Sequence, residues 1–122
     1  MSNSQGDFNP KAFLALAKKL VESPDDPAAH RTVISRSYYA AFLLTRTKLG
    51  LSRAAHAEVW EALKGLGGAK WWLMAHDAQN LRRQRNSADY GGRIYRLADE
   101  AKKAIGMADR IVQEIAGIEK VR

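Results

Sequence analysis

Residues 94–115 read IYRLADEAKKAIGMADRIVQEI and carry the strongest structural signal in the chain. Apolar side chains recur there at every third or fourth position for about six turns, which is the spacing of one face of an α-helix. The positions on that face are Ile94, Leu97, Ala98, Ala101, Ala104, Ile105, Ala108, Ile111, Val112 and Ile115. A continuous apolar face must pack against other helices, so this segment predicts a helical bundle.

Further helices are predicted upstream, and no segment shows the alternating pattern of a β-strand. Asn9 and Asp26 are suitable N-caps, and each is followed by a proline, which favours the first helical position. We predict helices from Pro10 to the SPDDP segment (23–27), from Pro27 to about Lys48, from Ser52 to the glycines at 65–68, and from about Lys70 to Ser87, with a break at DYGG (89–92). The predicted fold is an all-α, up-and-down bundle of four or five helices.

The length and composition of the chain indicate one globular domain spanning residues 1–122, in which we expect residues 1–8 to be flexible. The sequence is 46% hydrophobic and 27% charged, which is typical of a folded chain. It has no cysteine, no apolar run long enough to cross a bilayer, and a polar start, MSNSQGDFNP, unlike a signal peptide. We therefore expect a cytoplasmic protein without disulfides and without membrane contact.

Residues 35–42 read SRSYYAAF and lie in the second predicted helix. The small residues in this segment let a neighbouring helix approach closely, while the aromatic residues fill the space on either side. We expect Tyr38 and Phe42 to belong to the core. Arg36 and Arg46 are expected in solvent; for Arg36, one turn from Tyr39, a stem that rests on that ring is the alternative.

Residues 81–90 read LRRQRNSADY and begin the most basic part of a chain whose formal net charge is +7. From Arg82 to Arg96 there are five arginines, no lysine and a single acid. Arginine favours bidentate recognition of phosphate or carboxylate, so the cluster predicts an anionic partner; a surface charge that only maintains solubility is the alternative. The candidate nucleic-acid-binding residues are Arg82, Arg83, Arg85 and Arg93. Helical spacing places Arg82 and Arg85 on or beside the apolar side of their helix.

The segments SRSYYAAF and LRRQRNSADY, in this order, resemble the HEPN family of prokaryotic helical-bundle proteins. The likeness is stronger to small stand-alone members with an Arg-Asn-x-Ala-Asp-Tyr sequence before the last long helix. In order and spacing it extends from the second helix to the last. The resemblance implies an up-and-down bundle that forms a homodimer, with the motif arginine in a cleft at the dimer interface.

The resemblance also implies a class of activity. Many HEPN proteins are metal-independent ribonucleases, including toxins of toxin–antitoxin pairs, whose partner is often a small nucleotidyltransferase, and nucleases of antiviral defence systems. Their active site is an arginine, often followed by asparagine, and then a histidine a few residues later. Arg85 and Asn86 match the start of this motif, but Tyr90 and two glycines stand where the histidine is expected. Members with Ala-Asp-Tyr at this point also tend to lack it, so catalytic activity stays an open question.

Candidate catalytic roles follow from the residues of the motif. Arg85 is expected to contact phosphate, and Asn86 to hydrogen-bond the ligand or support Arg85. Asp89 and Tyr90 are expected to complete the pocket, although reference pKa values of about 3.9 and about 10 suit neither to proton transfer near neutral pH. Asp89 is expected to orient Arg85 or Arg82; a plain ion pair on the helix surface is the alternative.

No metal ion and no cofactor are predicted. His30, His56 and His76 are isolated in the sequence, and each is expected to be structural or solvated. No His, Asp and Glu stand at a convincing ligand spacing. The glycines at 65–68 lack the following Lys-Ser/Thr of a phosphate-binding loop, so we interpret them as a turn.

Trp71 and Trp72 are neighbours on the fourth predicted helix, where consecutive side chains point about 100° apart and cannot share one core. The outlying ring is expected to pack on a partner subunit; a stacking surface for a base is the alternative.

Two functional hypotheses remain. The chain binds RNA or nucleotide, as a ribonuclease toxin or its inactive relative, or it is a non-enzymatic dimeric module whose arginines pair with acids of a protein partner such as a nucleotidyltransferase.

Overall fold

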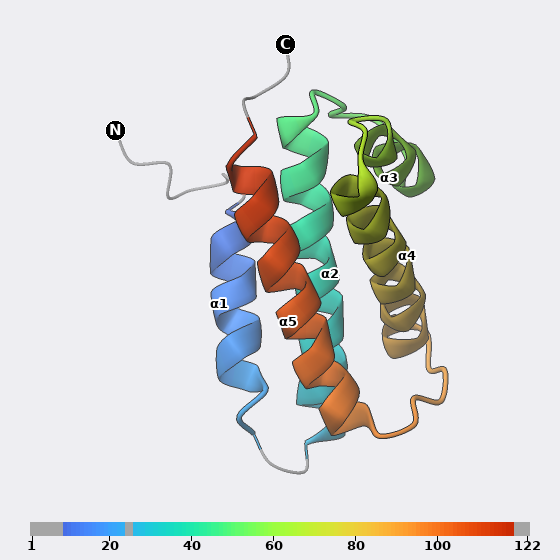
Figure 1. The fold of residues 1–122 in the computed structure, drawn as a ribbon. Helices are drawn as coiled ribbons and strands as arrows, with labels where there is room; N and C mark the ends of the chain where they lie inside the picture. The colour runs from blue at the N-terminus through green and yellow to red at the C-terminus, as the bar shows by residue number, and fades with distance from the viewer. Residues whose placement is uncertain (1–8, 24–25, 119–122) are drawn as a thin grey trace.

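The computed structural model describes residues 9–23 and 26–118, so the flexibility expected for residues 1–8 lies outside this part of the chain. It contains the helices α1 (Pro10–Leu20), α2 (Pro27–Lys48), α3 (His56–Lys64), α4 (Ala69–Asp89) and α5 (Leu97–Ala116). α1, α2, α4 and α5 run alternately down and up, and the short α3 lies at one end of the bundle beside the start of α4 (Figure 1). The prediction of an all-α bundle is confirmed.

The first two helices begin where their capping residues predict. Asn9 Oδ1 accepts hydrogen bonds from the backbone N–H groups of Lys11 and Ala12, at 3.0 and 3.4 Å. Asp26 Oδ1 accepts one from Ala29 N at 3.1 Å. These bonds satisfy donors that have no partner inside the first turn of a helix.

The start predicted for the third helix is wrong, because α3 begins at His56 and not at Ser52. Leu51 N donates to Arg46 O and Ala54 N to Leu51 O, each at 2.9 Å, so the chain turns here before it becomes helical. The Glu58 side chain then accepts a hydrogen bond from Ala55 N at 3.0 Å. This later start places His56 in the first turn of α3.

The junction between the last two helices also differs from the prediction. α4 continues through Asp89, two residues beyond the predicted end, and Gly91 follows with a φ of 82°. The apolar spacing predicted that the last helix includes Ile94, but Arg96 has a left-handed φ of 55° and α5 starts at Leu97. A left-handed residue interrupts the helical hydrogen-bond pattern, so the apolar stripe begins before the helix does.

α2 is the central helix and contacts each of the other four. It shares its most extensive interface with α5, and both helices have buried small residues that allow close approach. These are Ser37, Ala40 and Ala41 in α2, and Ala101, Ala104 and Ala108 in α5. Tyr38 and Phe42 belong to the core, as predicted. Tyr38 is the aromatic ring on which the site described below is built.

Candidate functional site

Arg85 occupies a core-facing position on α4. The buried residues of this helix are Met74, Ala75, Ala78, Leu81, Arg85 and Ala88. A charged side chain therefore continues the apolar stripe, as the helical spacing predicts, and only 7% of Arg85 is exposed. A charge so far removed from water requires stabilisation by the groups around it.

Two aromatic rings of α2 supply part of that stabilisation. The guanidinium carbon of Arg85 lies 5.5 Å from the ring centroid of Tyr38 and 5.0 Å from that of Tyr39, within the range of cation–π attraction. Its Nη1 is 3.6 Å from Asp89 Oδ2, one turn further along α4. This ion pair is longer than a hydrogen bond, so it balances charge without saturating the donors of Arg85.

Asp89 is held in place from α2 as well. The Ser35 hydroxyl donates a hydrogen bond to Asp89 Oδ2 at 3.2 Å. The carboxylate is about one-third exposed and, among the described residues, forms an ion pair with Arg85 alone. The contact is of the kind expected for an acid that orients Arg85.

Arg31 fixes the end of α4 against α2. Its Nη1 donates to the carbonyl oxygens of Ser87 and Ala88, at 2.9 and 3.2 Å, and its Nη2 donates to Gly92 O at 2.7 Å. The last carbonyls of a helix lack internal partners and carry partial negative charge, so a guanidinium suits them. Arg31 thereby positions the turn of α4 that carries Arg85 and Asp89.

His56 joins the site through a chain of hydrogen bonds that begins at Trp60. Trp60 Nε1 donates to the Tyr38 hydroxyl oxygen at 3.2 Å, and this hydroxyl lies 2.6 Å from Nδ1 of His56. Tyr38 is fully buried, so its hydroxyl proton needs an acceptor, and Nδ1 is the acceptor within reach. Tyr38 therefore donates to Nδ1, which leaves the proton of neutral His56 on Nε2. His56 has the structural role that was one of its two expected outcomes, because Nδ1 is bound by Tyr38 and the ring stacks on Phe42, but its position near the arginines was not predicted.

Burial and nearby cations both favour the neutral form of His56. Desolvation lowers the pKa of His56 below its usual 6.5, and the charges of Arg82, Arg85 and Arg46 lower it further. Burial also raises the pKa of Tyr38 to about 12, against the opposing effects of the Trp60 hydrogen bond and the nearby arginines. Both side chains are therefore uncharged near neutral pH.

Arg46, Arg82 and Arg85 form what we call the arginine cluster. All three charges lower the pKa of His56, and each side chain has a buried Nε that finds no hydrogen-bond partner among the described residues. The guanidinium carbon of Arg46 lies 5.2 Å from the Phe42 ring, on which the His56 ring stacks at 4.0 Å. The expectation that Arg46 lies in solvent is therefore wrong, because Phe42 draws it against the core; Arg36 likewise rests over Phe13, at 4.9 Å.

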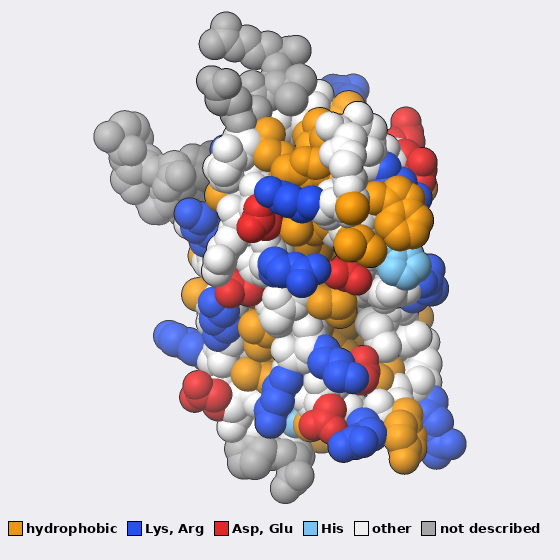
Figure 2. Space-filling model, in the orientation of Figure 1, with side chains coloured by type: hydrophobic (Ala, Val, Ile, Leu, Met, Phe, Trp, Pro, Cys, Tyr) orange, Lys and Arg blue, Asp and Glu red, His pale blue; other side chains and the backbone are white. Residues whose placement is uncertain are grey.

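The arginine cluster has an excess of positive charge. Within the described residues, Arg46 and Arg82 form no ion pair, and Arg85 has only Asp89. On the face shown in Figure 2, basic side chains lie among acidic ones. Among the described residues outside the cluster, ion pairs join Lys18 to Asp109, Lys70 to Glu114, and Arg110 to Asp77, while Arg36 and Arg83 form none. Buried donors without partners and unbalanced charge together indicate a place for an anion.

A hollow of about 440 Å³ lies beside two residues that contact Arg85, although Arg46, Arg82 and Arg85 are not among its lining residues. Tyr39 and Asp89, which both contact Arg85, are part of its wall. The remaining lining residues are Phe13, Arg31, Thr32, Ser35, Arg36 and Ala88. This hollow is mostly polar in its side chains and opens between α1, α2 and the end of α4.

The structure divides the four arginines predicted to bind nucleic acid. Arg82 and Arg85 lie together, whereas Arg83 and Arg93 line a different hollow, of about 530 Å³, beside α5. There Arg83 donates a hydrogen bond to Asn80, and Tyr95 forms part of the wall. One helix presents Arg82 and Arg83 to different sides because neighbouring positions point about 100° apart.

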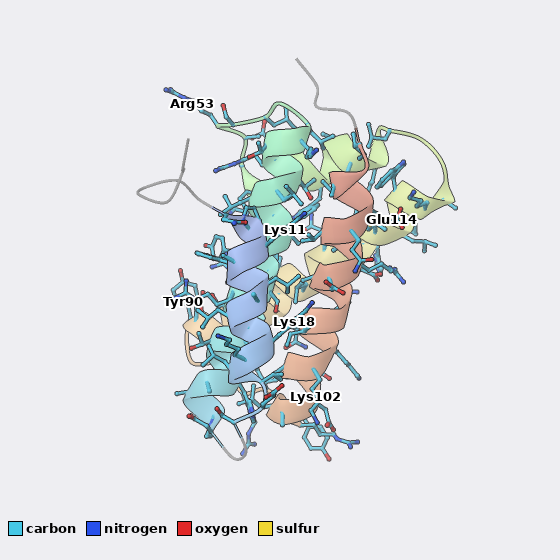
Figure 3. The ribbon with its side chains drawn as sticks, turned by 90° about the vertical axis from the view of Figure 1, so that its left-hand side faces the viewer. Lys11, Lys18, Arg53, Tyr90, Lys102 and Glu114 are labelled. Atoms are coloured by element: carbon cyan, nitrogen blue, oxygen red, sulfur yellow. The ribbon has the colours of Figure 1, made fainter. Side chains whose placement is uncertain are left out.

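The side chains of Asn86 and Tyr90 form no hydrogen bond, ion pair or ring contact within the described residues. Asn86 is exposed, and Tyr90, which follows the last residue of α4, has 80% of its surface in solvent. Figure 3 shows Tyr90 at the edge of the molecule. Of the four residues predicted to be catalytic, Arg85 and Asp89 are the two whose side chains interact within the described residues, while Asn86 and Tyr90 are joined by a backbone hydrogen bond of 3.0 Å from Tyr90 N to Asn86 O.

The paired tryptophans separate as their helical spacing predicts. Trp71 packs against the core, whereas Trp72 is 52% exposed and stacks on His76, with ring centroids 5.9 Å apart. Leu66 and Leu73 are also exposed near this end of the bundle. We call Leu66, Trp72 and Leu73 the apolar patch.

Sequence reasoning missed Arg46, His56 and Arg31 as parts of the site. Arg46 had a detectable signal, because Tyr38, Phe42 and Arg46 follow one another at four-residue intervals and so share one side of a helix. For His56 and Arg31, the sequence carried no signal that they belong to the site. Their contacts depend on how α2, α3 and α4 cross.

Two features are absent from the part of the chain that the structure describes. It contains no group of three His, Asp or Glu side chains able to hold a metal ion. None of its helices combines the length and the apolar character needed to cross a bilayer. Comparisons with family models, curated proteins and solved structures gave no match.

Proposed function

We propose that this chain is a HEPN-like protein that binds the phosphate groups of RNA or nucleotides through the arginine cluster. The observation that carries the proposal is the set of three arginines whose buried Nε donors have no partner around a neutral histidine. Permanent charge and several fixed N–H donors suit phosphate oxygens. Phosphate would satisfy the donors and balance the charge at once.

Binding is better supported than cleavage. Metal-independent cleavage of RNA needs a group that removes the 2′-hydroxyl proton and a group that protonates the leaving oxygen. Nδ1 of His56 is occupied by the Tyr38 hydroxyl, and Asp89 is engaged with Arg85 and Ser35. Of the two forms of this proposal, an inactive RNA- or nucleotide-binding protein is therefore better supported than a ribonuclease toxin.

A salt titration tests the proposal. A labelled single-stranded RNA should bind more weakly as NaCl rises from about 50 to about 200 mM, because bound phosphates release counterions. Arg82→Gln should weaken binding and reduce the salt slope by about 0.7, the share of one phosphate contact. Lys102→Gln is the charge-matched control, since Lys102 is an exposed residue of α5 (Figure 3). Binding that ignores salt, or that falls equally in both variants, contradicts the proposal.

Incubation of RNA with the protein in EDTA separates binding from cleavage. We expect intact RNA with the wild-type protein. Cutting that Arg85→Gln abolishes would instead establish a metal-independent ribonuclease at the same site.

A second function, the dimeric interaction module, is favoured by the apolar patch. Trp72 and Leu73 are each 52% exposed, which is more apolar surface than a solvated helix needs. In this alternative the patch joins two copies or a protein partner such as a nucleotidyltransferase, and the arginine cluster pairs with acids of that partner. An RNA affinity indifferent to salt, together with tight self-association, would favour it.

A further inference from the structure

We propose that the ligand of the arginine cluster is a phosphate monoester, the terminal phosphate of a nucleotide or of an RNA end, and not an internal phosphodiester. This inference rests on the proposed function and narrows its ligand class. It follows from the charge of the cluster, from the origin of its donors and from the hollow beside it.

The charge of the site matches a dianion. Arg46, Arg82 and Arg85 carry three permanent positive charges, Asp89 is the one carboxylate paired with them, and His56 is neutral. Within the arginine cluster itself, two positive charges are left unbalanced; Arg31 and Arg36, on the wall of the hollow, are not in this count because they lie against the carbonyls at the end of α4 and the ring of Phe13. A phosphate monoester carries about 1.5 to 2 negative charges at neutral pH, whereas a diester carries one. A diester would leave a cation uncompensated beside Arg85, which is only 7% exposed.

The donors of the site come from three helices. Arg46 belongs to α2, His56 to α3, and Arg82 and Arg85 to α4. The Nε2–H of His56 makes no hydrogen bond within the described residues and is not buried. A monoester offers three terminal oxygens to donors that approach from different sides. A diester offers two, and its chain must leave in two directions.

The rest of a monoester ligand needs space on one side only. The hollow walled by Tyr39 and Asp89, which both contact Arg85, offers such a space, with a volume of about 440 Å³, which is within the range of small-ligand pockets. The hydroxyls of Thr32 and Ser35 and the guanidinium of Arg36 line its wall. These groups suit the hydroxyls of a sugar and the polar edge of a base.

Matched oligoribonucleotides test the inference on the full chain. Fluorescence anisotropy should compare one short sequence carrying a 5′-phosphate, a 3′-phosphate or no terminal phosphate. We expect one phosphorylated form to bind at least about tenfold more tightly than the unphosphorylated RNA, the effect of one additional charge-assisted contact. The preferred end identifies an RNA terminus as the source. Competition by AMP at lower concentration than either RNA identifies a free nucleotide, and competition by inorganic phosphate isolates the phosphate group itself.

Variants assign the preference to the arginine cluster. Arg46→Gln and Arg82→Gln should each reduce the ratio of the two affinities, while Lys102→Gln should leave it unchanged. Both arginines are half-buried, so these variants are better tolerated than Arg85→Gln, and circular dichroism verifies that they fold. His56→Gln should reduce the ratio less, since it removes one neutral donor.

The outcomes separate this inference from the proposed function. Equal, salt-dependent binding of all three RNAs overturns the monoester inference and leaves phosphate binding in place. A phosphate preference that Arg46→Gln and Arg82→Gln do not alter also overturns it. Absence of binding by every RNA and by AMP overturns both.

Discussion

The hydroxyl of Tyr38 lies 2.6 Å from Nδ1 of His56, and this contact fixes which nitrogen of the imidazole carries the proton. Trp60 fills one acceptor site of the same hydroxyl, so Tyr38 must use its proton on His56. The result is a neutral histidine with a free Nε2–H beside three arginines. Such a group can donate a hydrogen bond to an anion but is poorly placed to act as a base.

The depressed pKa of His56 predicts how stability depends on pH. In the unfolded chain His56 takes up a proton near pH 6.5, whereas in the folded protein it does so only at lower pH. The unfolded state therefore binds more protons in this interval. The contribution of His56 to the free energy of unfolding is present above pH 6.5 and is lost as the pH falls from 6.5 through the pKa of the folded state. Urea unfolding of wild type and His56→Phe across this range measures it. The variant should lose less stability on acidification; parallel curves would contradict the neutral assignment.

Arg31→Gln should destabilise the fold. The substitution removes three hydrogen bonds from a charged donor to carbonyls at the end of α4, and we expect a loss of about 2–4 kcal/mol in the free energy of unfolding. Chemical denaturation measures the loss. Arg53→Gln, at an exposed position that forms no ion pair within the described residues, is the matched control (Figure 3). Equal midpoints for the two variants would contradict the anchoring role of Arg31.

Asp89→Asn should strengthen phosphate binding. The substitution removes the one carboxylate that competes for Arg85, while the amide oxygen can still accept from Ser35. We expect a gain of roughly threefold to tenfold in RNA affinity at low salt. Asp109→Asn makes the same charge change on α5 and should have a smaller effect. A loss of affinity in Asp89→Asn would indicate that Asp89 contacts the ligand.

Trp72→Ser should weaken self-association. The ring is 52% exposed beside Leu73, and its burial in a homodimer would remove apolar surface from water. Sedimentation velocity should show dimers for wild type and more monomer for the variant. Tyr95→Ser, at a position that is 84% exposed on the other hollow, should leave the distribution unchanged. A variant that remains dimeric places the interface elsewhere.

The fold was predictable because its determinants are local. The helical spacing of residues 94–115 and the caps at Asn9 and Asp26 act within a few residues of one another. The first residues of α3 and α5 were not predictable from the sequence. The start of α3 depends on a turn after Arg46, and the start of α5 on the left-handed conformation of Arg96. Neither feature has a signature in residue type.

The candidate site was predictable only in part. The apolar stripe of α4 correctly indicated that Arg85 turns inward, since position along one helix determines it. The meeting of Arg46, His56 and Arg82 depends on the crossing of three helices, which no single segment encodes. For the same reason, Arg83 and Arg93 were predicted with the others although they line another hollow.

Arginine Nε–H resonances provide the most direct measurement of the central claim. In a ¹H–¹⁵N spectrum recorded with increasing AMP, we predict that the Nε–H signals of Arg46, Arg82 and Arg85 shift together, because phosphate supplies the partner that each buried Nε lacks. The signals of Arg83 and Arg93 should remain in place. Unchanged signals from the arginine cluster, with shifts confined to Arg83 and Arg93, would contradict the account.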